Sequence, residues 1–408
     1  MSKPLEGVTV VEVALWGFVP SGGALLAEWG ADVIKVEHAR TGDPQRGLSR
    51  MGDFVMGDPN PAWTHPNHGK RSIGIDLASE GGRELLGELV RDADVFLTSF
   101  LPAARRKLKI DVDHIRAENP KIVYARGSAL GPRGDESEFG GYDMTAFWCR
   151  ASTAQSITPR DMDGMIGPPG PAYGDTVSGS NLAGGIAAAL FKRERTGEGS
   201  VVDVSLLGSG VWAMGMSIDT SIMHEKAWEG QPMGLVVSPF NPLTGTYRTA
   251  DDRLLTLVML QPDRYWADVC RHVGLDEYAD DERFATSEAL AQNGDSAIAL
   301  LREAFASRTL DQWTEALRTM DGPWAPVQDT VQVIDDHQVR ANGYISAVVD
   351  DDGNEAGYDL VSGPVQFDEE PSVLRRAPEF AEHTELLLME RGIEWERIAA
   401  LKESGAIT

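Results

Sequence analysis

The N-terminal third of the chain alternates between short apolar runs and helical patterns, and this alternation constrains the fold more than any other feature. Residues 8–15 (VTVVEVAL) have the pattern of a buried strand, and residues 33–37 (VIKVE) have that of a second strand. Between them Pro20 opens a predicted helix over residues 21–29, because a proline in the first helical turn loses no hydrogen bond. A strand, a helix and a strand within about 30 residues form a βαβ unit with parallel strands.

The same alternation continues beyond this unit and sets the fold class. Strands that alternate with helices form a parallel sheet with helices on both faces. The sequence therefore predicts an α/β protein whose large domain, residues 1–225, has a Rossmann-like parallel sheet. Its further strands and helices are predicted at residues 72–77, 80–91, 95–100, 112–118 and 122–125.

A second, smaller domain is predicted after the large one. Residues 226–243 are rich in Gly and Pro and indicate a linker. Residues 244–330 begin with two strand patterns and continue with three helical patterns. Strands and helices that are segregated in this way are typical of an α+β domain.

Charge and length exclude several classes of partner. The chain has 408 residues and a formal net charge of −26. Nucleic-acid binding depends on neutralising phosphates, so this acidity argues against it, and equally against docking on an anionic membrane surface. No apolar stretch is long enough to span a bilayer. The N-terminus lacks the pattern of an export signal, so we expect a cytoplasmic protein.

Neither the cysteines nor the histidines form a metal-binding pattern. Cys149 and Cys270 are far apart and each stands alone, which favours two reduced thiols over a disulfide framework. The eight histidines include no H-E-x-x-H spacing, and His65 and His68 are their one H-x-x-H pair. We therefore expect no bound metal and no prosthetic group.

The βαβ start invites a nicotinamide-dinucleotide hypothesis, and the first turn contradicts it. A dinucleotide site needs G-x-G-x-x-G there so that the backbone can approach the pyrophosphate. In this chain the glycine spacing is different, and Trp16, Phe18 and Pro20 crowd the position of the phosphates. A dinucleotide-dependent oxidoreductase is therefore rejected.

Two basic clusters stand out in this acidic chain. Residues 105–109 (RRKLK) follow a predicted strand end, where ligands of parallel sheets bind, and include Arg106 and Lys107. Lys70 and Arg71 form the second cluster at the start of another strand. Lys and Arg bind phosphate, so the clusters permit a phosphate-bearing ligand. Solvated surface charge remains the alternative interpretation.

A Gly-Asp pair in the loop at residues 167–180 carries the candidate nucleophile. Asp175 follows Gly174 near the start of a helix, where the helix dipole favours an ionised carboxylate at neutral pH. An ionised carboxylate can attack an activated acyl group. The alternative is an N-cap role for Asp175 on a helix beginning near Ser178.

Several segments taken together resemble CoA-transferase family III, the CaiB/BaiF group of carnitine and bile-acid CoA-transferases. Each segment alone is a weak signal, and the order and coverage of the whole set carry the resemblance. The segments lie at residues 4–8, 30–37, 42–44, 69–73, 93–95, 119–120, 140–143, 193–206, 241–247, 281–284, 326–327 and 383–384.

The resemblance implies an acyl-CoA site with a catalytic aspartate, which corresponds to Asp175. It implies that Arg71 and Arg106 face the phosphates of CoA. It also implies CoA as a substrate and a carboxylic acid as acceptor. The further CoA contacts that it implies are Trp16, Gly17, Phe18, His38, Ile75, Ser99, Lys107 and Tyr142.

The family plan also implies an architecture. Residues 331–408 would return to the large domain, so that each chain forms an open ring, and two rings would interlock as a homodimer. Trp16, Phe18, Trp148 and Tyr173 are candidates for an apolar acyl pocket, although such aromatic residues are often plain core.

Three functions stay open on the sequence. A CoA-transferase would work through an aspartyl anhydride and an aspartyl-CoA thioester. A 2-methylacyl-CoA racemase of the same family needs a second proton-transfer group, and its histidine is replaced here by Tyr142, a poor base at neutral pH. A non-catalytic acyl-CoA-binding relative is the third. The retained Asp175 favours the transferase.

Overall fold

The computed structural model describes residues 3–234 and 236–408, which fall into two compact units. The larger unit comprises the chain up to Ile157 together with Met165–Trp228 and His337–Thr408. The smaller unit comprises Thr158–Gly164 and Glu229–Asp336.

A six-stranded sheet organises the larger unit, and every neighbouring pair in it is parallel. This confirms the predicted parallel sheet, and the order from edge to edge is the one typical of dinucleotide-binding folds. The prediction omitted the last strand. In spatial order the strands are β5 (Arg71–Gly74), β2 (Asp32–Glu37), β1 (Thr9–Val13), β6 (Val95–Thr98), β7 (Val123–Ser128) and β8 (Val201–Ser205).

Two hydrophobic clusters form the core, one on each face of this sheet. On one face α1 (Phe18–Glu28) and α7 (Tyr173–Thr196) pack against side chains such as Val10 and Leu97. On the other face, Val11 and Phe96 meet helices from both ends of the chain. These helices are α3 (Glu80–Arg91), α5 (Val112–Glu118), α16 (Thr384–Glu390) and α17 (Trp395–Glu403). Adjacent residues on one strand point to opposite faces, which explains why the strands are continuously apolar.

The strand order reverses between β1 and β6, and this reversal positions the site. Ligands of open parallel sheets bind outside the carboxyl ends of the strands at such a switch point. The loops that start at Ala14, Ser99 and Ala129 leave β1, β6 and β7 at this edge.

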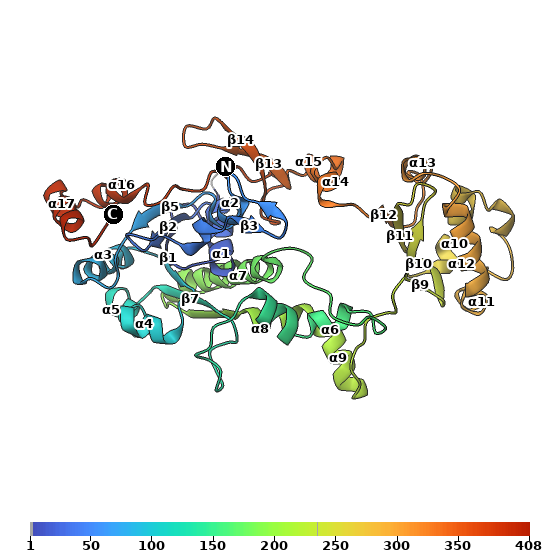
Figure 1. Ribbon diagram of the computed structural model, residues 1–408, viewed down its shortest axis with the longest axis horizontal. Helices are drawn as coiled ribbons and strands as arrows, with labels where there is room; N and C mark the ends of the chain where they lie inside the picture. The colour runs from blue at the N-terminus through green and yellow to red at the C-terminus, as the bar shows by residue number, and fades with distance from the viewer. Residues whose placement is uncertain (1–2, 235) are drawn as a thin grey trace. The chain divides into compact units, whose positions relative to one another are not determined.

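The C-terminal segment returns to the larger unit, in red in Figure 1 beside the blue and cyan N-terminal elements. Ile407 forms an isolated bridge with Ile75, and the Thr408 hydroxyl donates to the carbonyl of Ala39 at 2.7 Å. A three-stranded sheet in the order β14-β13-β15 belongs to the same return. Its elements are α15 (His337–Ala341), β13 (Ile345–Val349), β14 (Glu355–Val361) and β15 (Leu374–Arg375).

Shorter elements complete the larger unit. They are η1 (Pro44–Gly47), β3 (Arg50–Met51), β4 (Phe54–Val55), α2 (Pro61–Asn67), α4 (Pro102–Leu108), the π-helix η2 (Met144–Arg150), α6 (Thr153–Ile157), α8 (Leu206–Ala213) and α9 (Gly215–His224).

The smaller unit is an antiparallel sheet packed against helices around a core that includes Trp266, Phe305 and Trp313. The predicted linker, residues 226–243, differs from the structure, because β9 pairs with β10 inside this unit. The elements are β9 (Val237–Ser238), β10 (Asn241–Arg248), β11 (Leu254–Val258), α10 (Pro262–Val273), η3 (Asp276–Tyr278), α11 (Ser287–Gln292), α12 (Gly294–Phe305), α13 (Leu310–Ala316), β12 (Trp324–Pro326) and α14 (Thr330–Ile334).

Among the described residues, no helix has both the length and the apolar character needed to cross a membrane.

Candidate active site

A cavity of about 650 Å³ opens at the switch point of the large sheet. This is the size range of small-molecule sites in proteins. Its walls come from the loops after β1, β6 and β7, the segment before η2, and the starts of α7 and α8. The lining residues are Leu15, Trp16, Phe18, Ser99, Phe100, Leu101, Ala104, Gly127, Ser128, Ala129, Gly140, Gly141, Tyr142, Thr145, Asp175 and Leu206.

Asp175 enters this cavity from the first turn of α7. The helix begins at Tyr173, and its N-cap, Ala172, makes no side-chain capping bond. The alternative prediction, an N-cap role for Asp175 on a helix near Ser178, is therefore wrong. Gly174 is required before it, because a Cβ there would lie 2.4 Å from Cγ of Phe147.

Burial determines the protonation of Asp175. Loss of solvent and, to a smaller extent, the nearby charge of Asp143 together raise the pKa of Asp175 to about 7. The expectation of a fully ionised carboxylate at neutral pH, drawn from the helix dipole, is wrong. Desolvation disfavours the charged form, and here it outweighs the dipole.

Gly17 lies directly against this carboxylate. A Cβ built at Gly17 would be 2.8 Å from Oδ2 of Asp175, which is closer than real Cβ contacts. Gly17 is the N-cap of α1, and any residue can adopt its φ of −84°. Glycine is therefore required here by the lack of space for a Cβ and not by the backbone conformation. The predicted contact of Gly17 with CoA stays a prediction.

Four of the residues predicted to contact CoA meet in the cavity: Trp16, Phe18, Ser99 and Tyr142. The rings of Trp16 and Tyr142 meet edge to face at 6.0 Å. The backbone N–H of Leu15 donates to Oγ of Ser99 at 2.9 Å, which ties the loop after β1 to the loop after β6.

The second basic cluster is not at this cavity, and its predicted role as a phosphate site stays a prediction. Arg71 lies at the start of β5, the opposite end from the cavity edge, and pairs with Asp32 at 2.5 Å and with Glu390 at 2.6 Å. Lys70 is fully buried and donates to Glu12 at 2.8 Å.

Lys70 instead belongs to a buried ionic network behind the first loop. Lys35 lies 3.2 Å from Glu12 and 2.9 Å from Asp43. Oδ1 of Asp43 accepts the backbone N–H of Trp16 at 3.4 Å. Because every member of the network is buried, it supports the loop that carries Trp16 and does not reach a ligand.

Three other predicted contacts do not line the cavity. Ile75 is 1% exposed and its side chain belongs to the core. His38 is exposed beyond β2, where its Nδ1 accepts the backbone N–H of Thr41 at 3.4 Å. Lys107 lies in the last turn of α4. The roles of these three residues toward CoA stay predictions.

A polar cavity of about 250 Å³ adjoins the first and shares with it Phe100, Leu101, Gly127 and Ser128. Arg106 lines it, paired with Glu138 at 3.0 Å. Arg105, from the same predicted basic cluster, and Arg126 line it as well. Arg126 was not predicted, although its position at the carboxyl end of β7 could have indicated it.

The remaining aromatic candidates lie elsewhere. Trp148 is buried, and its Nε1–H donates to the carbonyl of Ile166 at 2.9 Å. Its ring meets Tyr173 edge to face at 6.3 Å. Neither residue lines the cavity, so the expectation that they form its wall is wrong.

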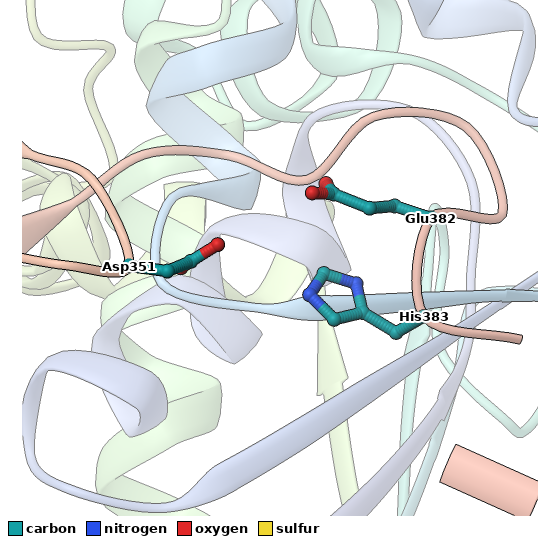
Figure 2. A group of neighbouring side chains, drawn as sticks. All are labelled: Asp351, Glu382 and His383. Carbon is teal, nitrogen blue, oxygen red and sulfur yellow. The ribbon is translucent and has the colours of Figure 1, made fainter. Parts of the chain in front are cut away.

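Asp351, Glu382 and His383 converge in the return segment, as Figure 2 shows, with potential ligand atoms within 4.8 Å of one another. The guanidinium of Arg376 donates to Asp351 at 2.7 Å and to both carboxylate oxygens of Glu382. The backbone N–H of Ser72 donates to Nδ1 of His383 at 3.3 Å, so the proton of the neutral ring sits on Nε2. Desolvation lowers the pKa of His383, which favours this neutral form. An arginine-centred ion-pair cluster fits these residues better than a metal site.

The sequence profile of CoA-transferase family III matches residues 5–384 of this chain. The chain belongs to CoA-transferase family III. CoA transfer is therefore the general activity, with CoA or acyl-CoA as substrate, as the resemblance implied.

Family III relatives match over nearly the full length. The (R)-2-hydroxy-4-methylpentanoate CoA-transferase of Clostridioides difficile is 30% identical over 409 residues, which cover 99% of both chains. The cinnamoyl-CoA:phenyllactate CoA-transferase of Clostridium sporogenes is 29% identical over 403 residues, or 98% of this chain and 96% of that one. The formyl-CoA:oxalate CoA-transferase of Streptomyces avermitilis is 30% identical over 432 residues, covering 100% of both.

Solved structures of the family share this fold. A CaiB/BaiF family protein from Brucella suis has a TM-score of 0.79 at 27% identity and covers 96% of this chain and 100% of its own. Rv3272 from Mycobacterium tuberculosis has a TM-score of 0.77 at 26% identity, covering 94% of this chain and 99% of its own.

Proposed function

We propose that this family III protein moves CoA from an acyl-CoA donor to a carboxylic acid acceptor through covalent intermediates on Asp175. The observation that carries the proposal is the placement of Asp175. It is a buried carboxylate in the wall of the cavity at the switch point, and its pKa of about 7 leaves a substantial ionised fraction at neutral pH. Desolvation also makes such a carboxylate a more basic nucleophile than one in water.

Each step of the proposed reaction forms one bond and breaks another. A carboxylate oxygen of Asp175 attacks the thioester carbonyl of the donor, the C–S bond breaks, and CoA leaves as the thiolate. The thiolate then attacks Cγ of Asp175 in this mixed anhydride, which gives the aspartyl-CoA thioester and releases the donor acid. The acceptor carboxylate reverses both steps. No net proton transfer is needed.

The surrounding chain supports this chemistry in two ways. Backbone N–H groups of the glycine-bearing walls, which include Gly140 and Gly141, are candidates to stabilise the oxyanions. The aromatic walls at Trp16 and Phe18 limit water around intermediates that hydrolyse readily.

The phosphates of CoA are proposed to bind at the adjoining polar cavity. Arg105, Arg106 and Arg126 line it, and guanidinium groups bind phosphate bidentately. The proposed path for CoA therefore runs from this arginine-lined cavity to the thioester position beside Asp175.

The acyl group is proposed to be apolar. Leu15, Phe100, Leu101 and Leu206 supply apolar walls, and no Lys, Arg or His is among the described residues that line the larger cavity. A second carboxylate on the substrate would find no cation there. Two of the relatives are named for acids with apolar side chains, phenyllactate and 2-hydroxy-4-methylpentanoate. A panel of acceptor acids that includes oxalate measures this preference.

We also propose that two chains form the interlocked homodimer that the family resemblance implies. The exposed apolar residues of α8 and α9 support an association of chains, because Trp212, Met216 and Met223 are all more than three-quarters exposed.

The deciding experiment traps the intermediates. The protein is incubated with acyl-CoA and hydroxylamine, and the peptide that contains Asp175 is weighed by mass spectrometry. We expect an aspartyl hydroxamate at Asp175. Asp175→Ala should abolish both the adduct and turnover, whereas Asp113→Ala, which removes an exposed aspartate from the first turn of α5, should leave both unchanged.

Two outcomes would redirect the proposal. An unmodified peptide from an actively turning-over preparation would rule out the covalent route. Solvent deuterium entering the α-position of the acyl group without any acceptor acid would indicate the racemase instead, whose second base the structure would have to supply from Tyr142 or elsewhere.

A further inference from the structure

Asp143 is a buried carboxylate that touches the backbone of the nucleophile's own turn. It directly follows Tyr142 and precedes η2, and it is 8% exposed. The backbone N–H of Gly174 donates to its Oδ2 at 3.0 Å. The backbone N–H of Asp175 is close enough to this carboxylate to lower its pKa. A residue more than thirty positions upstream therefore holds the first turn of α7.

This contact caps the N-terminus of α7. The N-cap of α7, Ala172, makes no side-chain capping bond, so the first N–H groups of the helix need an acceptor from outside. Asp143 supplies that acceptor. The turn that carries Asp175 is thereby fixed to the N-terminal end of η2, where Asp143 lies.

The second oxygen of Asp143 shows that capping is not its whole role. Oδ1 is buried and has no hydrogen-bond partner among the described residues. Leaving half of a charged group unsatisfied in the interior is costly, and an asparagine could cap the turn with a neutral side chain instead. The negative charge itself is therefore the feature to be explained.

Within the part of the chain that the structure describes, no unpaired opposite charge on α1, α8, β7 or η2 compensates it. On α1 the only ionisable residue is Glu28, at the far end of the helix; α8 contains no ionisable residue. Arg126 on β7 pairs with Asp203 of β8, and Arg150 on η2 pairs with Glu136. Tyr142 is the other titratable residue in the cavity wall.

We propose that Asp143 is the positioning residue of this active site: it fixes the turn that presents Asp175, and its buried charge keeps that nucleophile basic. This role rests on the proposed function, in which Asp175 attacks the thioester. Burial raises the pKa of Asp143 as well, so the two carboxylates titrate as an interacting pair.

Asp143→Asn separates positioning from charge. The amide oxygen can still accept the N–H of Gly174, and the amide nitrogen replaces the unpartnered oxygen without a charge. We expect the acid limb of the trapping rate, which should have its midpoint near the pKa of Asp175, to move to lower pH by about 1 unit or more. The rate on the alkaline plateau should fall about 3- to 10-fold, because a less basic carboxylate is a weaker nucleophile.

The experiment measures the rate of hydroxylamine trapping on Asp175 from pH 5 to 9 in the full chain. Asp113→Asn is the matched control, since it removes one aspartate charge from the first turn of another helix. Asp143→Ser, which keeps an acceptor oxygen in a smaller side chain, gives the same test if the asparagine variant is poorly folded. Thermal unfolding of each variant reports on folding separately.

The outcomes are distinct. A downward shift of the midpoint in Asp143→Asn with none in Asp113→Asn supports the role. An unchanged midpoint, with or without a uniform loss of rate, overturns it and leaves Asp143 as a structural cap. Absence of any adduct on Asp175 in the unaltered protein would instead overturn the proposed function.

Discussion

At the scale of single residues, burial decides the chemistry of Asp175. Its position in the first turn of a helix is worth typically less than 1 kcal/mol to an exposed anion. Desolvation in the cavity wall acts in the opposite direction, and together with the smaller effect of the Asp143 carboxylate it raises the pKa of Asp175 to about 7. The site thus keeps a carboxyl group near its titration midpoint at neutral pH.

This raised pKa predicts a pH-dependent stability cost. Between the ordinary value of 3.8 and about 7, the folded chain holds a proton at Asp175 that the unfolded chain has released. Stability therefore falls as pH rises through this range. Asp175→Asn removes the cost, so the variant should be more stable than the unaltered protein at pH 8, by on the order of 1–4 kcal/mol, and by clearly less at pH 5.

Thermal unfolding at the two pH values measures this difference. Asp113→Asn serves as the control, because this aspartate is exposed. An equal change in Tm at pH 5 and pH 8 for Asp175→Asn would contradict the assigned burial of the charge.

At the scale of elements, the close crossing of α1 and α7 brings Gly17 and Asp175 together. A Cβ at Gly179 would lie 2.8 Å from Cβ of Ser21 and 2.9 Å from the backbone nitrogen of Gly22. Glycine on both helices therefore sets their separation. The N-terminal ends of α1 and α7 both contribute to the cavity wall. The distance between the two helices therefore also determines the geometry of the site.

Gly179→Ala should push the two helices apart. We expect a loss of about 1–3 kcal/mol in the free energy of unfolding, as for other overpacked core positions. The trapping rate at Asp175 should also fall, because the carboxylate moves relative to Gly17. Chemical denaturation and the trapping assay measure the two effects.

Gly184→Ala on the same helix is the matched control. A Cβ at Gly184 meets nothing within 4 Å. Alanine in an exposed helical position should stabilise α7 by up to about 1 kcal/mol and leave trapping unchanged. Equal effects of the two substitutions would show that helix propensity, and not the crossing, governs both positions.

The elements also show where sequence patterns succeed and fail. The apolar runs of β1, β2 and β6 are buried on both faces and were predictable from composition alone. The start of α7 was not predictable, because residues 167–174 are rich in proline and glycine and indicate a loop, whereas the helix begins at Tyr173. Its first turn is completed by the carboxylate of Asp143, a partner distant in sequence.

At the scale of the whole molecule, a net charge of −26 coexists with an arginine-lined cavity. Electrostatic screening limits the reach of surface charge to about 8 Å at physiological salt. A polyanionic ligand beside Arg105 and Arg106 therefore responds to these local charges far more than to distant acids. The overall charge argues against a nucleic-acid surface without excluding CoA.

The proposed interlocked dimer makes a prediction about subunit exchange. Two linked rings cannot separate without opening one chain, so dilution alone should not dissociate them. Native mass spectrometry of a mixture of unlabelled and isotopically labelled protein should show the two parental dimers and no mixed species over many hours. A cycle of unfolding and refolding should produce the mixed dimer.

Two results would contradict this arrangement. A monomer mass in sedimentation equilibrium would exclude the dimer. Rapid appearance of mixed dimers without unfolding would retain a dimer but exclude interlocking.

The sequence by itself determined the parallel sheet, the family, the rejection of a dinucleotide site and the choice of Asp175, because strand periodicity, turn residues and ordered motifs are local properties of the chain. The tertiary structure decided which charged groups meet. In the folded chain Lys70 and Arg71 lie away from the cavity and form ion pairs. Arg126 lines the polar cavity, and Asp143 accepts a hydrogen bond from the first turn of α7. Burial and through-space charge set the state of Asp175, and neither can be read from the order of residues along the chain.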